Sequence, residues 1–99
     1  MDHFDFIQVT CERHVMTITI NRPEVLNALH SPAHFELARA FDTFAADPEM
    51  RVAILTAVGS RAFCVGSDLK LRAKTNVDNL PPTGFAGITR RYDLTKPVI

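Results

Sequence analysis

The loop that follows residues 51–58 carries the residue types best suited to chemistry in this chain. It contains Gly66 among several small residues and leads into a predicted short helix. Glycine lets a ligand approach the backbone closely, and backbone N–H groups just before a helix have no partner inside it. Such groups can stabilise an anion, including an oxyanion that forms during a reaction. On the residues alone, a plain strand–helix connection with Asp68 as a helix cap remains the main alternative.

Other reactive residue types have weaker support. His30 and His34 stand four residues apart, a spacing that suits a metal site on a helix, but His30 precedes the predicted helix start at Ser31. Cys64 would need a neighbouring base to act as a nucleophile, and the sequence shows none. We therefore expect no metal site and no cysteine nucleophile. The glutamates are expected to be solvated at the surface: Glu12, Glu24, Glu36 and Glu49.

The elements that would hold the loop follow from side-chain periodicity. Residues 4–12 and 15–20 alternate in side-chain type and predict a β-hairpin. Ser31 is the predicted N-cap of a helix that apolar residues at helical spacing carry to about residue 47. Residues 51–58 predict a strand buried on both faces. The order strand, helix, strand predicts a right-handed crossover with parallel pairing.

The pattern is weaker towards the end of the chain. It predicts a short helical stretch over about 69–74, a surface loop over 76–84 and an amphipathic helix over 85–94. Residues 96–99 predict a strand that has just begun, which suggests one domain cut at the start of a core strand. One sheet layer with one or two helices would leave a sheet face and an edge uncovered. The isolated chain is therefore expected to be poorly soluble or to self-associate.

Composition limits the class of protein. The chain has 99 residues, of which 46% are hydrophobic and 22% charged, and its formal net charge is zero. These values are ordinary for a globular domain, and neutrality gives no reason to expect nucleic acid or a membrane surface as a partner. No apolar run approaches the about 20 residues that span a bilayer, and the N-terminus does not resemble a secretory signal. The two cysteines fit a reducing compartment, with the cytoplasm as the default.

Several segments together resemble one known family. Residues 18–29, from Ile18 to Leu29 through Asn-Arg-Pro, are similar to the signature at the end of the second strand in the crotonase (enoyl-CoA hydratase/isomerase) superfamily. Residues 61–69 resemble that family's loop of the form (R/K)AF-x-x-G-x-D-(L/I), and residues 92–99 resemble the segment before its next core strand. The resemblance implies an α/β fold, the N-terminal part of a crotonase/ClpP-like spiral of ββα units.

The resemblance also implies a role for each loop residue. The backbone N–H of Ser67 would be one of two oxyanion-hole donors to the carbonyl oxygen of a thioester. Cys64 and Val65 would present backbone to the adenine end and pantetheine of coenzyme A. Lys70 would be a candidate phosphate contact, with a solvated helix face as the alternative. The implied acyl-CoA site comprises Val25, Leu26, Ala62, Cys64, Val65, Gly66, Ser67, Asp68, Leu69 and Lys70.

Two positions depart from the family's pattern. Glu24 stands where many relatives have Lys or Arg, which puts a charge contact to the CoA phosphate in doubt, and Arg22 is a candidate replacement. Val65 is larger than the Ala commonly found there and would narrow the pocket slightly. The second oxyanion donor and the catalytic carboxylates would lie beyond Ile99. Hydration, isomerisation, decarboxylation and thioester hydrolysis therefore all remain open.

The function implied by the resemblance is that of an enoyl-CoA hydratase/isomerase-type enzyme of fatty acid metabolism. These residues would form its acyl-CoA-binding part, which stabilises a thioester enolate and is inactive alone. A coenzyme A thioester would be the substrate, no cofactor would be needed, and the full-length form would be a homotrimer or hexamer. The alternative is a non-catalytic truncated form that acts as a binding or assembly module.

Overall fold

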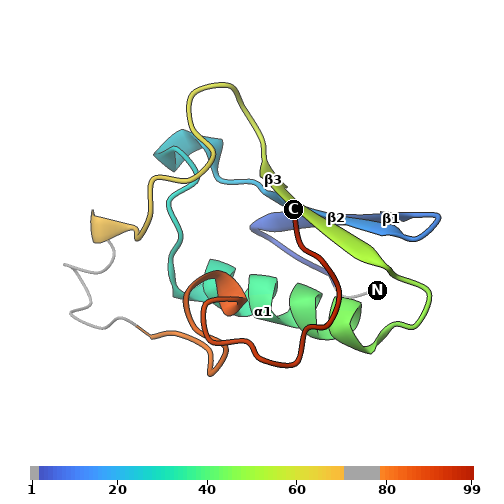
Figure 1. Ribbon diagram of the computed structural model, residues 1–99. Helices are drawn as coiled ribbons and strands as arrows, with labels where there is room; N and C mark the ends of the chain where they lie inside the picture. The colour runs from blue at the N-terminus through green and yellow to red at the C-terminus, as the bar shows by residue number, and fades with distance from the viewer. Residues whose placement is uncertain (1–2, 71–78) are drawn as a thin grey trace.

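The computed structural model describes residues 3–70 and 79–99 and shows one helix lying along one face of a small sheet (Figure 1). The elements, in chain order, are β1 (Ile7–Glu12), β2 (Val15–Ile20), the 3-10 turn η1 (Pro23–Val25), α1 (Ser31–Ala46), β3 (Val52–Ala57) and the 3-10 turn η2 (Phe85–Gly87). None of the helices in the described ranges is long and apolar enough to cross a membrane.

The sheet has the predicted pairing. Strand β1 runs antiparallel to β2, with Ile7 opposite Ile20, and β2 runs parallel to β3, with Val15 opposite Val52. The hairpin and the parallel crossover are therefore confirmed. Strand β1 begins three residues later than the predicted residue 4.

A buried carboxylate explains this late start and corrects one prediction. The backbone N–H groups of Asp5 and Phe6 donate to the two carboxylate oxygens of Glu36 at 2.9 and 2.8 Å, respectively, so they do not join the strand ladder. Glu36 is only 8% exposed, and the expectation that it is solvated at the surface was wrong. Its cost of burial is offset because both oxygens accept hydrogen bonds.

The last residues add a short parallel segment beside β3. Ala53 N–H donates to Pro97 O, Ile99 N–H donates to Ala53 O, and Leu55 N–H donates to Ile99 O, at 2.8 to 3.1 Å. Of the strand predicted over 96–99, the structure shows one isolated parallel bridge, between Val98 and Ala53. The ammonium of Lys96 donates to Phe44 O and Asp47 O at 2.7 and 2.6 Å, which ties this segment to the end of α1.

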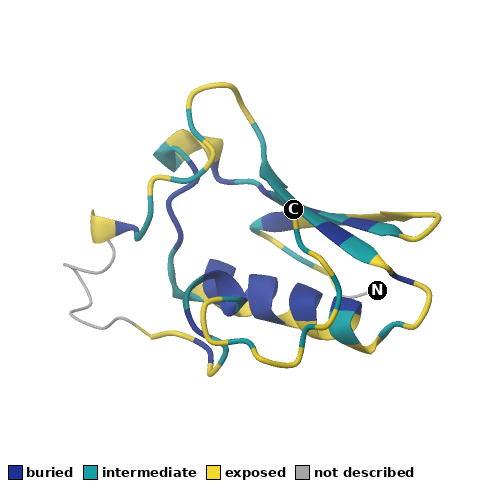
Figure 2. Cartoon of the chain, in the orientation of Figure 1, coloured by how far each residue is buried: buried dark blue, intermediate teal, exposed yellow. Residues whose placement is uncertain are grey.

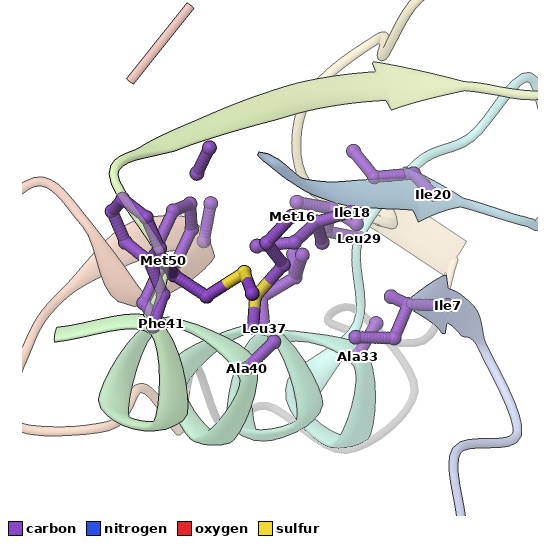
Figure 3. Packing of buried hydrophobic residues seen from close by; sticks show 13 residues of the cluster. Ile7, Met16, Ile18, Ile20, Leu29, Ala33, Leu37, Ala40, Phe41 and Met50 are labelled. Atoms are coloured by element: carbon purple, nitrogen blue, oxygen red, sulfur yellow. The ribbon is translucent and has the colours of Figure 1, made fainter. Parts of the chain in front are cut away.

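The core lies between the sheet and the helix, where α1 turns its buried side towards the strands (Figure 2). Alternation places Met16, Ile18 and Ile20 of β2 on that face, each at most 1% exposed. They belong to one cluster with Leu37 and Phe41 of the helix (Figure 3). Each such side chain contributes about 1.5–3 kcal/mol by leaving water, so this layer fixes the ends of β2 and β3 relative to α1.

The opposite face of the sheet is partly open. In β3 only Ala53 is fully buried, while Val52, Ile54 and Thr56 are half-exposed. The prediction that residues 51–58 are buried on both faces is therefore wrong for the described residues. The reason is that α1 covers only the face formed by Ala53 and its alternate neighbours.

The start of α1 differs from the prediction. The helix begins at Ser31 itself, His30 occupies the N-cap position, and no side chain caps the first turn. The Ser31 hydroxyl instead donates to Asn79 O at 2.7 Å. The serine therefore ties the helix to the segment that begins at residue 79.

The predicted amphipathic helix over 85–94 is also wrong. Only η2 is helical there, because Gly84, Ala86 and Gly87 all have left-handed φ values between 57° and 88°. Arg91 holds the segment on α1: its guanidinium donates to Ala38 O at 3.0 Å and lies 2.9 Å from an Asp42 carboxylate oxygen. The stretch predicted over 69–74 is helical at residues 69 and 70, and its remainder lies outside the described residues.

Candidate functional site

The turn after β2 is joined to the start of the 58–68 loop by the side-chain amide of Asn27. Asn27 is 1% exposed and has a left-handed φ of 59°. Its Oδ1 accepts the Arg22 backbone N–H at 2.9 Å, and its Nδ2 donates to Val58 O and Ala62 O at 3.0 and 3.1 Å. Asparagine tolerates this backbone conformation better than most residues. A single buried side chain thus fixes both the turn and the beginning of the loop.

A buried ion pair holds the end of the same loop. The Arg22 Nη1 lies 3.2 Å from Asp68 Oδ2, and both side chains are 9% exposed. The same nitrogen donates to Ala28 O at 2.6 Å. Breaking such a pair by removing one partner is strongly destabilising because a charge is left buried. Arg22 is therefore a structural cation, and the idea that it replaces a phosphate contact at position 24 was wrong.

Backbone pairing on either side of Ser67 determines where its own N–H points. Leu29 N–H donates to Gly66 O, and Asp68 N–H donates to Leu29 O, both at 2.8 Å. In a parallel bridge of this kind the N–H and C=O of the middle residue face away from the partner strand. No hydrogen bond within the described residues uses the Ser67 N–H. It is a donor with no acceptor among residues 3–70 and 79–99.

Gly66 leaves open space beside this donor. Its φ is 103°, a conformation that favours glycine, and among the described residues no atom beyond its two chain neighbours lies within 4 Å of the position that a Cβ would occupy. Its N–H donates to Cys64 Sγ at 3.4 Å, which closes a tight turn just before Ser67. The predicted close approach of a ligand to this backbone is therefore sterically allowed.

The other predicted site residues fall into two groups. Val65 and Leu69 are 55% and 69% exposed, and Lys70 is exposed as well. The Asp68 side chain, in contrast, is 9% exposed and pairs with Arg22, and its predicted place in an acyl-CoA site stays a prediction too. For the exposed residues, contact with coenzyme A stays a prediction.

Two hollows flank residues 59–62. One, of about 240 Å³, is lined by Pro23, Leu26, Asn27, Val58, Gly59, Ser60, Arg61 and Ala62. The other, of about 350 Å³, reaches from Thr56 to Phe63. Leu26 and Ala62 were predicted, and Val25 does not line either hollow. Arg61 lies at both and was missed, although the cation in the motif that begins at residue 61 could have indicated it.

His30 lies next to the ion pair rather than in a metal site. Its ring meets that of Phe6 edge-on at 4.3 Å, and its Nδ1 is buried without a hydrogen-bond partner among the described residues. Burial lowers the pKa of His30 below its usual 6.5, and the charge of Arg22 lowers it further, against smaller opposing effects of Asp68 and Glu36. The described residues contain no group of three or more side chains that could hold a metal ion.

This environment predicts an acid-sensitive contribution to stability. Because the folded protein disfavours protonated His30, the unfolded chain binds the proton more readily as pH falls through about 6.5. The free energy of unfolding should decrease over that range and level off once the folded protein is protonated too. Urea denaturation between about pH 5 and pH 7.5 should show a flatter profile for His30→Gln. His3→Gln is the control, since His3 is exposed, and equal slopes for both variants and the wild type would refute this assignment.

Comparison with known proteins identifies the family of this chain. The family model described as "Enoyl-CoA hydratase/isomerase" matches residues 10–99. The chain belongs to the enoyl-CoA hydratase/isomerase family. The predicted family resemblance is thereby confirmed.

The relatives of this chain in the family are much longer. A carnitinyl-CoA dehydratase of Citrobacter koseri is 42% identical over 87 residues, which cover 86% of this chain and 33% of that protein. A solved carnitinyl-CoA dehydratase from Mycobacterium avium 104 matches with a TM-score of 0.85 at 35% identity, over 94% of this chain and 37% of the other. A solved enoyl-CoA hydratase from Mycobacterium tuberculosis H37Rv matches with a TM-score of 0.80 at 36% identity. The match covers 94% of this chain and 36% of the other. The chain thus spans about a third of their length and shares their crotonase-type α/β fold.

Proposed function

We propose that this chain is the acyl-CoA-binding part of an enoyl-CoA hydratase/isomerase-type enzyme, in which the Ser67 N–H holds the carbonyl oxygen of a thioester. The observation that carries the proposal is the pairing of Leu29 with Gly66 and Asp68, which turns the Ser67 N–H away from Leu29 and leaves it without an acceptor in the described part of the chain. The remaining parts of the site, a second donor and the catalytic carboxylates, would come from residues after Ile99.

The chemistry requires such a donor. When water adds to a 2-enoyl thioester, the hydroxyl joins C3 and a proton joins C2, and negative charge develops on the thioester oxygen on the way. A rigid backbone N–H stabilises that charge without having to reorient, and loss of one such donor typically costs about 3–4 kcal/mol in the barrier. The names of the relatives, carnitinyl-CoA dehydratase and enoyl-CoA hydratase, support a hydratase-type reaction.

The hollow beside Leu26 and Ala62 is the proposed place for the coenzyme A moiety. Arg61 borders it and supplies a cation for a phosphate group, a role that Glu24 cannot fill. No cofactor takes part in the proposed reaction, because the coenzyme A group arrives with the substrate. A homotrimer or hexamer in the cytoplasm completes the proposal.

The proposal is tested by binding to the intact protein. An acyl-CoA thioester should bind at least about tenfold more tightly than the matching S-alkyl-CoA thioether, because only the thioester has an oxygen for the donor; tenfold corresponds to about 1.4 kcal/mol. Titration calorimetry measures both affinities, and hydration of a 2-enoyl-CoA tests the reaction. Equal affinities for the two ligands would reject the proposed role of Ser67.

A further inference from the structure

The ion pair between Arg22 and Asp68 stands directly behind the proposed donor. Asp68 follows Ser67 in the chain, and its carboxylate lies 3.2 Å from Arg22 Nη1. Both side chains are nine-tenths buried. Their burial leaves little of either side chain open to a ligand at the Ser67 N–H.

The pair belongs to a set of contacts on either side of Ser67. Arg22 Nη1 also donates to Ala28 O at 2.6 Å, and the next residue, Leu29, bonds to Gly66 O and Asp68 N–H at 2.8 Å. Arg22 therefore holds the 28–29 backbone and the Asp68 side chain at the same time. Any rotation of the peptide unit between Gly66 and Ser67 would have to disturb one of these bonds.

Stability alone is a weak reason for such a pair. A buried ion pair often contributes little to folding compared with apolar residues of the same shape, because both charges must leave water. Orientation is a stronger reason, since a donor that stabilises developing charge must be held close to its productive direction.

We propose that Arg22 and Asp68 are positioning residues, whose ion pair sets the direction of the Ser67 N–H and thereby the preference for a thioester carbonyl. This inference rests on the proposed function. His30 responds to the charges of both Arg22 and Asp68, so all measurements belong at one pH above the His30 titration range, about pH 7.5.

A double-mutant cycle in the intact protein separates positioning from stability. The variants are Asp68→Asn, Arg22→Met and the double variant, each measured for its urea midpoint and for the ratio of thioether to thioester dissociation constants. Each single variant removes one charge of the pair and keeps the other buried, so it should lower the midpoint; the double variant removes both charges and should recover part of it. The preference for the thioester should fall about tenfold in all three and not recover in the double variant.

Arg91→Met is the matched control, because Arg91 is another buried cation, with a side chain that is 1% exposed and paired to Asp42. It should lower the urea midpoint and leave the thioester preference unchanged. The inference is overturned if the double variant recovers both the thioester preference and the urea midpoint. It is also overturned if the thioester preference is unchanged in the single variants. If the wild type shows no thioester preference, the proposed function fails first and this inference falls with it.

Discussion

Replacement of Ser67 by proline is expected to abolish the preference of the intact protein for an acyl-CoA thioester over its thioether, a loss of at least about tenfold. Proline has no N–H, so the proposed donor disappears. The neighbouring bonds of Leu29 use Gly66 O and Asp68 N–H, which the substitution keeps. Titration calorimetry with the two ligands measures the ratio directly.

Ser67→Ala is the matched control for this substitution. It removes the hydroxyl and keeps the backbone N–H, so the thioester preference should stay within about twofold of the wild type. Thioether affinity should change little in either variant, since that ligand does not need the donor. A loss of preference in the alanine variant equal to that in the proline variant would show that the side chain, not the backbone, recognises the carbonyl.

Gly87→Ala is expected to lower the free energy of unfolding by about 3 kcal/mol or more. A Cβ at this position would lie 2.5 Å from Ala38 Cα and 2.6 Å from Ala38 N, and the φ of Gly87 is 67°. The helix backbone cannot yield as a flexible side chain could. The residues around η2 would therefore have to move off α1.

Gly59→Ala separates the steric effect from the backbone effect. Gly59 also has a positive φ, 87°, but the nearest atom to its Cβ position is 4.0 Å away. The expected cost is about 1 kcal/mol, from the left-handed conformation alone. Urea denaturation of both variants gives the difference. Equal losses would mean that the contact between Gly87 and α1 is not tight in solution.

Periodicity was sufficient for the central elements of the fold. The alternation of Met16, Ile18 and Ile20 predicted β2, and the helical spacing of Leu37 and Phe41 predicted α1. In both elements, apolar residues recur with the period of the face that is buried. The parallel pairing of β3 followed from chain order alone. These elements contribute most of the buried apolar surface.

Residues held by distant partners could not be predicted in the same way. Glu36 is buried because two backbone N–H groups about 30 positions away meet its carboxylate. The 85–94 segment is not helical, because Gly84 and Gly87 bend it and Arg91 binds the helix backbone. Nothing in the local pattern reveals these contacts.

The candidate site shows the same division. Gly66 and the small residues around it indicated a loop that a ligand can approach, and the structure leaves that side of Gly66 open. The resemblance pointed to Ser67 as the donor. The parts that fix its direction, Arg22, Asn27 and the Asp68 carboxylate, were assigned other roles or none, because their contacts join turns far apart in the sequence.

The central claim is that a thioester oxygen accepts a hydrogen bond from the Ser67 N–H. The most direct measurement is the proton shift of that amide in the intact protein labelled with ¹⁵N, recorded with the thioester and with the matching thioether. A downfield shift of the Ser67 amide proton with the thioester, and a much smaller one with the thioether, is the predicted result. The same shift with both ligands, or an unmoved Ser67 signal while neighbouring amides respond, would contradict the account.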